Sequence, residues 1–384
     1  MMHIFLNALG ASSASGLTYL RNVLPEFARR EHICTTVALN SRLYPEFANL
    51  NRVGFADLPE LRGTAQRFWF EQTRLPALVQ KLQADILISA GNFALRNSPI
   101  PQILLSGNSL YTSSDFHHDL LLRHEYRMWV DTRIKAALAK RSVHWADSTV
   151  APTRAFADEL RRWTGKAVIP IHHGFESQVF FSDNAALPPG IQSKLESGKD
   201  LKLLYVSHYN YFRNFETLFR ALPLIRKRLG RKVRLFLTCE LQEGRNPGAY
   251  RTKPALSLID QMGIQQEVVE LGAVPYQQLH HVYRSCDLYI TPSYAETFSH
   301  PLVEAMACGL PVIASDLPVH REVCGSAALY FPTFSAELLA DRVLEAANST
   351  DGEPRSEAVK LRFSWRDHVD QIISLADSLV TSAA

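Results

Sequence analysis

Two glutamates, Glu296 and Glu304, stand eight residues apart in the stretch from Thr291 to Val312. Glu296 lies in a polar loop after an apolar run, and Glu304 lies about one turn into a helix expected to begin near Pro301, because proline is tolerated in a first helical turn. Two carboxylates so arranged can reach the hydroxyl groups of one ligand, while the N–H groups of the first turn face a phosphate. The spacing predicts a site for a phosphorylated ligand with hydroxyl groups. On spacing alone, an equally weighted alternative is that Glu304 pairs within its helix and Glu296 is a solvated loop residue.

The elements that must position these side chains are short apolar runs, separated by amphipathic stretches of helix length such as Arg123–Ala139. This alternation predicts βαβ units, and therefore an α/β protein with two doubly wound parallel sheets. Ligands of such sheets bind at the carboxyl ends of the strands. The expected strands are His3–Leu9, Cys34–Asn40, Asp85–Ala90, Gln102–Ser106 and Ser148–Pro152 in the first sheet, and Lys202–Ser207, Lys232–Thr238, Val268–Gly272, Asp287–Pro292, Pro311–Ser315 and Ala327–Phe331 in the second.

The segment from Gly174 to Lys199 has no clear apolar period and contains a Pro188-Pro189-Gly190 turn, which is typical of a linker. The expected domains are therefore residues 1–176 and 177–364. A last helical stretch, Trp365–Val380, follows the final expected strand.

The composition excludes a disordered or fibrous protein, because 46% of the 384 residues are hydrophobic and 21% are charged. Residues 1–175 carry 20 basic and 14 acidic side chains, a net charge of +6, whereas residues 176–384 carry −3. A basic first half favours an anionic membrane surface or a phosphorylated substrate. The chain has no basic run or arginine-rich arm, so nucleic acid is not an expected partner.

The five cysteines are scattered and odd in number, which argues against a disulfide framework, and no Cys-x-x-Cys pair suggests zinc. The start of the chain lacks a basic segment, and Asn7 and Gly10 interrupt its apolar residues, so we expect a first strand and not a signal peptide. No stretch approaches the roughly 18 apolar residues that a membrane-spanning helix needs. We expect a cytoplasmic protein whose contact with a membrane is at most peripheral.

With the stretch Leu302–Ser315, the Glu-x7-Glu pattern of Glu296 and Glu304 closely resembles the signature of retaining glycosyltransferases of GT-B fold, glycosyltransferase family 4. The likeness is strong over about residues 201–344 and holds only in outline before them. It implies two Rossmann-like domains that face each other across a cleft. The first would bind the acceptor, with the helix 365–384 packing back on it, and the second would bind a nucleotide-sugar donor.

The resemblance also implies roles for particular residues. Glu296 would contact hydroxyl groups of the donor sugar, and Glu304 would bind the ribose of the nucleotide. The loop amides between them would meet the diphosphate, which assigns to the donor site Phe298, Ser299, His300 and Leu302.

The family's second donor element is an arginine and a lysine in the first loop of the second domain. His208 stands where the arginine usually stands, and Arg213 stands where the lysine does. Arg213 supplies a permanent cation able to bind phosphate oxygens in bidentate fashion, whereas His208 is charged only where a phosphate raises its pKa. Without the glutamate pattern, a solvated residue at a helix start would be the favoured interpretation of Arg213.

Three further residues match family positions that contact the donor. Val274 and Tyr276 match the loop that packs on the nucleotide base, although ordinary packing explains Tyr276 equally well. Gly16 matches a loop that closes over the diphosphate. Its segment, Leu9–Leu17, fits neither a GxGxxG nor a Walker A pattern, so a dinucleotide or P-loop site is not expected.

Many family members carry a histidine beside the donor sugar at the end of a first-domain strand. Here Asn108 stands nearest to that position, and the pair His117 and His118 is the alternative, although adjacent histidines in a polar loop are more often solvated. We expect a structural role for the segment His172–Gly174. The aromatic cluster Phe68–Phe70 lies in the basic stretch Arg62–Lys81; core packing is favoured over contact with a membrane or a lipid-linked acceptor.

The resemblance thus implies a retaining hexosyltransferase that uses a UDP- or GDP-sugar in polysaccharide or glycoconjugate biosynthesis, with a lipid-linked saccharide as one candidate acceptor. We expect no cofactor and no metal, so the catalytic candidates Glu296, Arg213, His208 and Asn108 would act without one. The alternatives are a non-catalytic nucleotide-sugar-binding subunit and a sugar-nucleotide epimerase of GT-B fold.

Overall fold

The computed structural model describes the chain except for residues 12–13, 62, 197, 199, 349–361 and 384. Ser12 and Ser13 of the N-terminal loop, Arg62 of the basic stretch and Lys199 of the expected linker therefore lie outside the described residues. The chain divides into two compact units. Unit 1 comprises residues 1–113, 120–174 and 364–384, and unit 2 comprises residues 114–119 and 175–363. The division after Gly174 lies near the predicted boundary, whereas the excursion of residues 114–119 into unit 2 was not expected.

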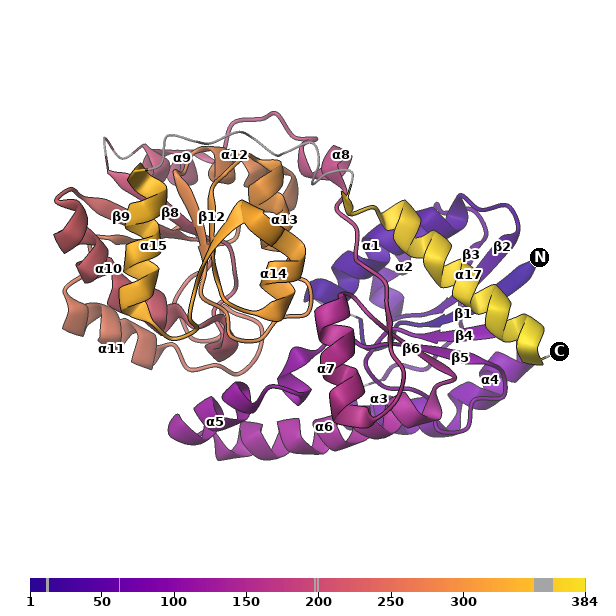
Figure 1. Ribbon diagram of the computed structural model, residues 1–384. Helices are drawn as coiled ribbons and strands as arrows, with labels where there is room; N and C mark the ends of the chain where they lie inside the picture. Colours follow the sequence, from indigo (N-terminus) through magenta and orange to yellow (C-terminus); the bar gives the residue numbers. More distant parts are fainter. Residues whose placement is uncertain (12–13, 62, 197, 199, 349–361, 384) are drawn as a thin grey trace. The chain divides into compact units, whose positions relative to one another are not determined.

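Unit 1 is built on a seven-stranded parallel sheet of order β3-β2-β1-β4-β5-β6-β7 (Figure 1). All five strands expected in this half are present, but two edge strands, β3 and β7, were missed. They span only three and two residues, too few to show a pattern of alternation. The strands are β1 (Met2–Asn7), β2 (Ile33–Ala38), β3 (Val53–Phe55), β4 (Ile86–Ser89), β5 (Gln102–Leu105), β6 (Ser148–Ala151) and β7 (Ile169–Pro170).

Helices cover both faces of this sheet. Ile4 and Leu6 of β1 belong to a core with α1 (Ala14–Ala28) and α17 (Trp365–Ala383), whereas Phe5 belongs to a second core with α3 (Gly63–Thr73) and α4 (Leu75–Lys81). Because alternate residues of a strand point to opposite faces, the two cores lie on opposite sides of the sheet. The other helices that begin in or border unit 1 are η1 (Ser41–Leu43), α2 (Tyr44–Phe47), η2 (Ser109–Tyr111), α5 (Ser114–Leu122), α6 (Tyr126–Trp145) and α7 (Arg154–Thr164).

The aromatic cluster of α3 points in three directions, as three consecutive helical residues must. Phe70 is buried in the core, Phe68 meets Phe93 edge-on with ring centroids 6.0 Å apart, and Trp69 is exposed. Core packing therefore accounts for Phe70 and not for Trp69.

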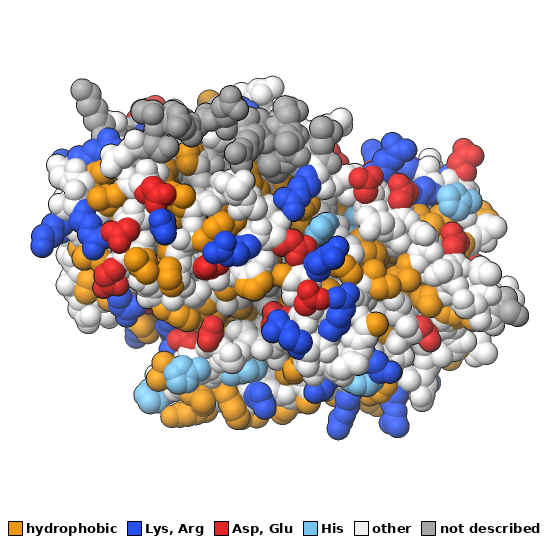
Figure 2. All heavy atoms as spheres, in the orientation of Figure 1, with side chains coloured by type: hydrophobic (Ala, Val, Ile, Leu, Met, Phe, Trp, Pro, Cys, Tyr) orange, Lys and Arg blue, Asp and Glu red, His pale blue; other side chains and the backbone are white. Residues whose placement is uncertain are grey.

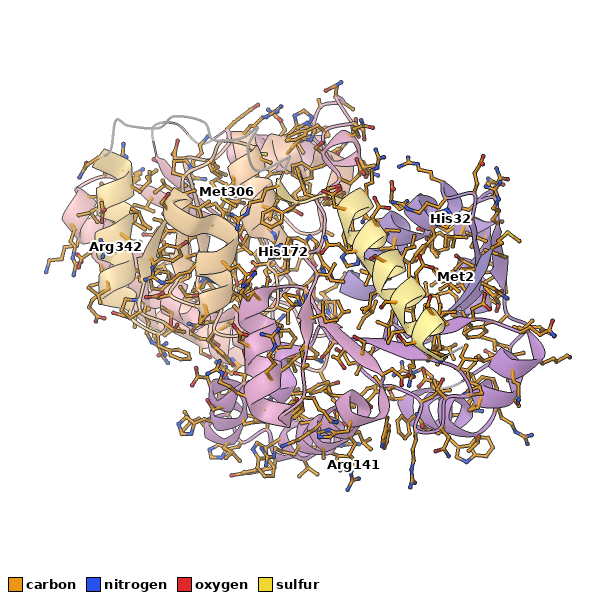
Figure 3. All side chains as sticks on the ribbon, turned by 45° about the vertical axis from the view of Figure 1, so that its right-hand side comes forward. Met2, His32, Arg141, His172, Met306 and Arg342 are labelled. Atoms are coloured by element: carbon orange, nitrogen blue, oxygen red, sulfur yellow. The ribbon has the colours of Figure 1, made fainter. Side chains whose placement is uncertain are left out.

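The start of α17 is fixed by the segment His172–Gly174 (Figure 3). Nδ1 of His368 lies 2.8 Å from the His172 carbonyl oxygen and donates to it, and Tyr19 donates from its hydroxyl to Nε2 at 3.0 Å. The ring of His173 stacks on Trp365 with centroids 5.3 Å apart. These contacts give the segment the structural role that we expected for it.

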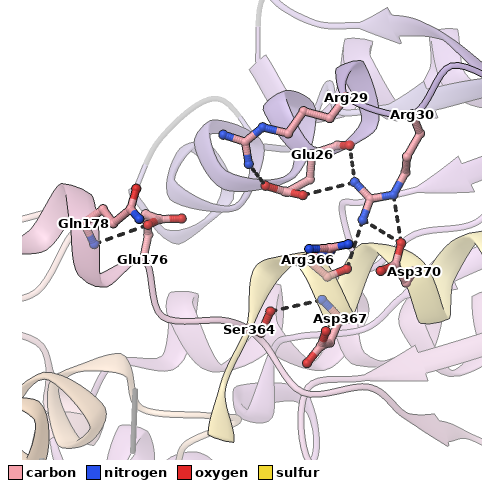
Figure 4. A network of polar contacts seen from close by, with 9 residues as sticks. All are labelled: Glu26, Arg29, Arg30, Glu176, Gln178, Ser364, Arg366, Asp367 and Asp370. Atoms are coloured by element: carbon pink, nitrogen blue, oxygen red, sulfur yellow. Dashed lines mark hydrogen bonds and ion pairs between the residues drawn. The ribbon is translucent and has the colours of Figure 1, made fainter. Parts of the chain in front are cut away.

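Polar contacts extend the attachment of α17 to α1 (Figure 4). Arg30 of α1 pairs with Asp370 of α17 at 2.6 Å and donates to the backbone oxygen of Arg366 at 3.2 Å. Glu26, which is buried, pairs with Arg30 at 3.0 Å and orients its guanidinium. α17 is therefore held by its apolar face and by the Arg30 guanidinium of α1, which Glu26 of the same helix orients.

Unit 2 is built on a six-stranded parallel sheet of order β10-β9-β8-β11-β12-β13, and all six strands were expected. Its strands are β8 (Leu201–Tyr205), β9 (Val233–Leu237), β10 (Val268–Glu270), β11 (Leu288–Thr291), β12 (Val312–Ser315) and β13 (Ala328–Phe331). Its described helices are α8 (Ser177–Phe180), α9 (Pro189–Leu195), η3 (Tyr211–Arg213), α10 (Phe215–Leu229), α11 (Lys253–Met262), η4 (Tyr276–Gln278), α12 (Leu279–Arg284), α13 (His300–Ala307), α14 (Pro318–Cys324), η5 (Gly325–Ala327) and α15 (Ala336–Asn348).

The prediction of a linker between Gly174 and Lys199 was wrong for most of that segment. α8 and α9 lie within it and belong to unit 2, where Phe180, Ile191 and Leu195 are buried. These helices have four and seven residues, too short to show a helical period in the sequence.

Candidate functional site

The sheet of unit 2 has a topological switch point between its two central strands. β8 leads to β9 and β10 on one side, and β11 leads to β12 and β13 on the other, while β8 and β11 pair directly. The loops after these two strands diverge at the carboxyl edge of the sheet, where α/β proteins of this kind bind ligands. The first loop carries His208 and Arg213, and the second carries Glu296.

Arg213 and Glu296 meet at this switch point. Nη1 of Arg213 forms an ion pair with Oε1 of Glu296, whose carboxylate is largely buried, and lies 3.4 Å from the Ser293 hydroxyl. Nε of Arg213 is buried and has no hydrogen-bond partner among the described residues. The site therefore holds a permanent cation that is only partly satisfied by protein groups, which suits it to bind an oxyanion.

The backbone around Arg213 is tied to both central loops. The Tyr205 hydroxyl, at the end of β8, donates to the Arg213 carbonyl oxygen at 2.8 Å. Asn214 adopts a left-handed conformation with φ 54°, and its Nδ2 donates to the Pro292 carbonyl oxygen at 3.0 Å. Thr217 donates to the Asn214 Oδ1 at 2.8 Å, which orients this amide. Tyr205 and Asn214 are not recognisable as site residues from the sequence, because the partner of Tyr205 lies across a turn and that of Asn214 lies in the second loop.

His208 lies in the same loop as Arg213. Partial burial lowers its pKa, and the nearby Arg213 guanidinium lowers that pKa further. The imidazole is therefore neutral at pH 7 when no anion is bound.

Glu304 lies inside α13, buried, where its carboxylate accepts a hydrogen bond from the Tyr283 hydroxyl at 2.8 Å. Burial raises the pKa of Glu304 to about 7, although the hydrogen bond from Tyr283 acts in the opposite direction. The group can thus either accept or donate a hydrogen bond near neutral pH. Tyr283, on α12, is a further site residue that the sequence alone does not reveal.

The residues between the two glutamates differ in what they can offer a ligand. Phe298 and Leu302 have buried side chains, and Phe298 packs edge-on against Phe363 at 5.2 Å, so only backbone groups of these two residues can contact a ligand. Burial lowers the pKa of His300 to about 4, which makes its imidazole neutral. Ser299 precedes α13 with φ 67°, and its buried Oγ has no hydrogen-bond partner among the described residues.

Val274 and Tyr276 lie beyond the carboxyl end of β10, away from the two central loops in strand order. Val274 is partly exposed, and Tyr276 packs on Phe180 with ring centroids 5.2 Å apart while part of it stays accessible. A cavity of about 510 Å³ also opens at this end of the sheet, lined by residues that include Glu240, Lys253 and Glu270.

Two predicted site residues belong to unit 1. Gly16 lies in the first turn of α1, where a Cβ atom would come within 2.6 Å of the Ala11 Cα, so the close approach of the loop requires glycine. Asn108 caps η2 by accepting from the Leu110 N–H at 3.0 Å. Of the alternative pair on α5, His118 is exposed and both ring nitrogens of His117 are buried.

Unit 1 has its own switch point, between β1 and β4. Asn7, the last residue of β1, donates from Nδ2 to the buried Glu71 of α3 at 3.2 Å. Arg67, one turn earlier, approaches Glu71 to 4.0 Å and lies beside Gly10, and its buried Nε has no hydrogen-bond partner among the described residues. This polar group was not identified from the sequence, because Asn7 and Glu71 are 64 residues apart.

Within the described part of the chain, no group of three or more His, Cys, Asp or Glu side chains is arranged to hold a metal ion. Over the same residues, no helix combines the length and the apolar content that crossing a bilayer requires.

Comparison with known proteins assigns the two halves of the chain. The model for glycosyl transferases group 1 matches residues 190–360, and the model for glycosyltransferase family 4 matches residues 17–178. The two matches do not overlap, and together they span most of the chain. The chain belongs to glycosyltransferase family 4. The group 1 match contains the loops that carry Arg213, Glu296 and Glu304.

Curated relatives match this chain over part of their length. The O-antigen chain mannosyltransferase B of Escherichia coli is 30% identical over 108 residues, which are 27% of this chain and 28% of the relative. The D-inositol 3-phosphate glycosyltransferase of Mycolicibacterium smegmatis is 35% identical over 128 residues, 30% of this chain and 28% of the relative. The matched regions thus span less than a third of either relative.

Solved structures match this chain over its whole length. Sucrose-phosphate synthase from Thermosynechococcus elongatus gives a TM-score of 0.74 at 17% identity, covering 100% of both chains. Anabaena HepE in complex with UDP-glucose gives 0.71 at 18% identity, covering 99% of this chain and 100% of its own. The likeness confirms the GT-B fold that the sequence predicted.

Proposed function

We propose that this protein transfers a sugar from a nucleotide-diphosphate donor to an acceptor hydroxyl, with retention of the anomeric configuration. The observation that carries the proposal is the meeting of Arg213 and Glu296 at the switch point of unit 2, at positions where family 4 binds the donor. Support for sugar transfer also comes from the names of the E. coli and M. smegmatis relatives.

In this proposal, Arg213 carries the positive charge that stabilises the departing diphosphate, together with the first-turn N–H groups of α13. When the donor binds, one carboxylate oxygen of Glu296 accepts hydrogen bonds from hydroxyl groups of the sugar in place of its contact with Arg213. Glu304 binds the ribose, and Val274 and Tyr276 contact the base. HepE was solved with UDP-glucose, which supports UDP as the first nucleotide to test, with GDP as the second.

We propose that the acceptor binds unit 1, near Asn7, Arg67 and Glu71 at the carboxyl ends of β1 and β4. The buried Nε of Arg67, which lacks a partner among the described residues, supports an acceptor that carries an oxyanion. Gly16 and Asn108 belong to the same unit and remain candidates for contacts to the donor.

Nucleotide binding tests the donor site without knowledge of the acceptor. A ligand that binds only the folded state stabilises it by RT ln(1 + [L]/Kd), about 2.7 kcal/mol at a hundred times Kd. We expect UDP or GDP to raise the melting temperature in a panel that also holds ADP, CDP and TDP. Arg213→Ala and Glu304→Ala should abolish the shift, whereas Arg342→Ala, a surface control on α15 of the same unit, should retain it.

Turnover separates an enzyme from a binding subunit. With the nucleotide sugar found in this way, Glu296→Gln should retain nucleotide binding and lose transfer to a panel of neutral, phosphorylated and lipid-linked acceptors. We expect transfer to continue after chelation of divalent ions, and NMR of the product should show retained configuration. If the wild type transfers no sugar and Glu296→Gln loses only affinity for the nucleotide sugar, the protein is a non-catalytic subunit. If the sugar nucleotide is converted to another one without any acceptor, the protein is an epimerase.

A further inference from the structure

The long helix α6 of unit 1 presents an outward face that its packing leaves uncovered. Its inward side buries Thr132, Ala136, Ala139 and Val143, which recur at helical spacing. With about 100° between successive helical residues, the opposite side carries Val130, Ile134, Ala137 and Arg141. An exposed apolar side of a surface helix is unusual, because such helices place polar residues toward solvent.

The preceding residues extend this apolar surface. Leu121 and Leu122 at the end of α5 and Tyr126 at the start of α6 are exposed, as are Val130 and Ile134. Their exposed fractions lie between 41% and 65%, so these five side chains form an accessible surface that we call the α6 face. Figure 2 shows apolar side chains along the edge where α5 and α6 run in Figure 1, with Lys or Arg side chains among them.

Cationic side chains flank the α6 face. Residues 120–145 contain six basic and two acidic residues, a net charge of +4. Arg127 and Arg133 are exposed on either side of Val130 and Ile134, and Arg141, which is labelled in Figure 3, is exposed on the same side of the helix as these two apolar residues. Asp131 is paired with Lys135 at 2.6 Å, so it does not offset the arginines.

The exposed apolar side chains and the arginines beside them indicate which kind of surface covers the α6 face. A second copy of the chain would bring two strongly basic helices together, and like charges across an interface cost several kcal/mol. The hydrocarbon boundary of a lipid bilayer accepts apolar side chains, and anionic headgroups attract the arginines beside them. Charge complementarity thus favours an anionic lipid surface over self-association.

We infer that the α6 face binds the surface of an anionic lipid bilayer, with α6 lying in the plane of the interface and its arginines at the headgroups. This site is distinct from the stretch Arg62–Lys81 to which the sequence drew attention. It does not depend on the proposed transfer reaction, because no residue of the donor site takes part.

Vesicle co-sedimentation of the full chain tests the inference. We expect the protein to bind phosphatidylcholine vesicles that contain phosphatidylglycerol, and to bind pure phosphatidylcholine much more weakly. The double variant Val130→Asp/Ile134→Asp should reduce binding by at least roughly tenfold, because it places charge in the apolar layer. Arg133→Gln and Arg141→Gln should each reduce binding to anionic vesicles by roughly fivefold, and added salt should weaken the wild type in the same way.

A matched control is Leu338→Asp, which changes an exposed leucine on α15 of unit 2 and should leave binding unchanged. All of these positions are exposed, so far-UV circular dichroism and the urea midpoint should match the wild type. Absence of binding to anionic vesicles at low salt would overturn the inference, as would equal binding by the Val130/Ile134 variant. Concentration-dependent dimerisation abolished by that same variant would instead assign the face to a second copy.

Discussion

At the residue scale, Glu304 is a buried carboxyl whose ionisation is poised near neutral pH. Its pKa of about 7 results from burial, and Tyr283 supplies one hydrogen bond to it. In the unfolded chain the same group ionises near pH 4.5. Folding therefore binds a proton at this residue between those two values, which makes stability depend on pH there.

Replacement of Glu304 by glutamine should remove that dependence. The contribution of Glu304 is fully present below about pH 4.5 and is lost as pH rises through about 7, because the folded state must then ionise a buried group. Relative to Glu304→Gln, the wild type should lose about 3 kcal/mol over this range. Urea unfolding of both proteins from acid to mildly alkaline pH measures the difference.

Tyr283→Phe provides the control for this prediction. The variant removes the hydrogen bond that lowers the Glu304 pKa, so the pH dependence should become larger and extend to higher pH. A free-energy difference between the wild type and Glu304→Gln that stays constant with pH would contradict the burial argument.

His208 should make nucleotide binding depend on pH. Its pKa is lowered in the free protein by partial burial and by Arg213, and a bound diphosphate would raise it, so binding takes up a proton. Affinity for the nucleoside diphosphate should fall as pH rises from the lowered pKa of His208 in the free protein to its higher pKa in the complex, by at most roughly tenfold per unit. Isothermal titration in buffers of different ionisation enthalpy measures both the affinity and the proton uptake.

The phosphate groups ionise in the same range, so the comparison must be with variants. His208→Gln should lose the proton uptake assigned to the protein, and His208→Arg should bind more tightly with little pH dependence. If wild type and His208→Gln took up the same number of protons, His208 would not contact the diphosphate.

The residues of the donor site differ in how far the sequence could reveal them. Glu296 and Arg213 follow apolar runs directly, so their place at the carboxyl ends of strands is readable from the chain. Their direct pairing is not readable, because it requires β8 and β11 to be neighbours although 83 residues separate the side chains. Tyr283 and Asn214 are recognisable only through partners, Glu304 and Pro292, that other elements bring to them.

At the element scale, the joint between Gly174 and α17 tolerates no added side chain. A Cβ atom at Gly174 would lie 2.1 Å from the Trp365 backbone nitrogen, and such a clash cannot be relieved by turning a side chain. Gly174→Ala should therefore destabilise unit 1 by about 1 to 3 kcal/mol. Urea unfolding measures the loss.

Gly54→Ala is the matched control, because nothing lies within 4 Å of a Cβ at Gly54. Its free energy of unfolding should stay within about 0.5 kcal/mol of the wild type. Equal effects of the two substitutions would show that glycine removal in general, and not the contact with Trp365, determines the loss.

Strands and helices were predictable where their burial produces a recognisable pattern of apolar residues in the sequence. Central parallel strands are buried on both faces and appear as nearly continuous apolar runs, as β8, β9, β11 and β12 of unit 2 do. β3 and β7 at the edges, and α8 and α9 in the expected linker, have too few residues for any period to emerge. Their positions follow from tertiary contacts.

At the scale of the whole molecule, charge and fold are distributed differently. Both units have the same parallel α/β architecture, yet the first 175 residues carry +6 and the rest carry −3. A count of charges along the chain does not say where on the surface this asymmetry lies. The structure locates much of it along α6, where the α6 face adds exposed apolar side chains that the composition of the chain does not reveal.

The last helix of unit 1, α17, lies at the C-terminal end of the chain, after all of the residues of unit 2. The apolar side of α1, with Leu24 and Phe27, is covered by Val369 and Ile372 of α17, yet residues 175–363 of unit 2 separate the two parts of unit 1. During synthesis at roughly 5 to 20 residues per second, the ribosome spends on the order of 10 to 40 seconds on unit 2 before α17 is made. All seven strands of unit 1 precede residues 175–363 in the chain, so for that interval its sheet has every strand, while the side of α1 that α17 covers stays without its partner.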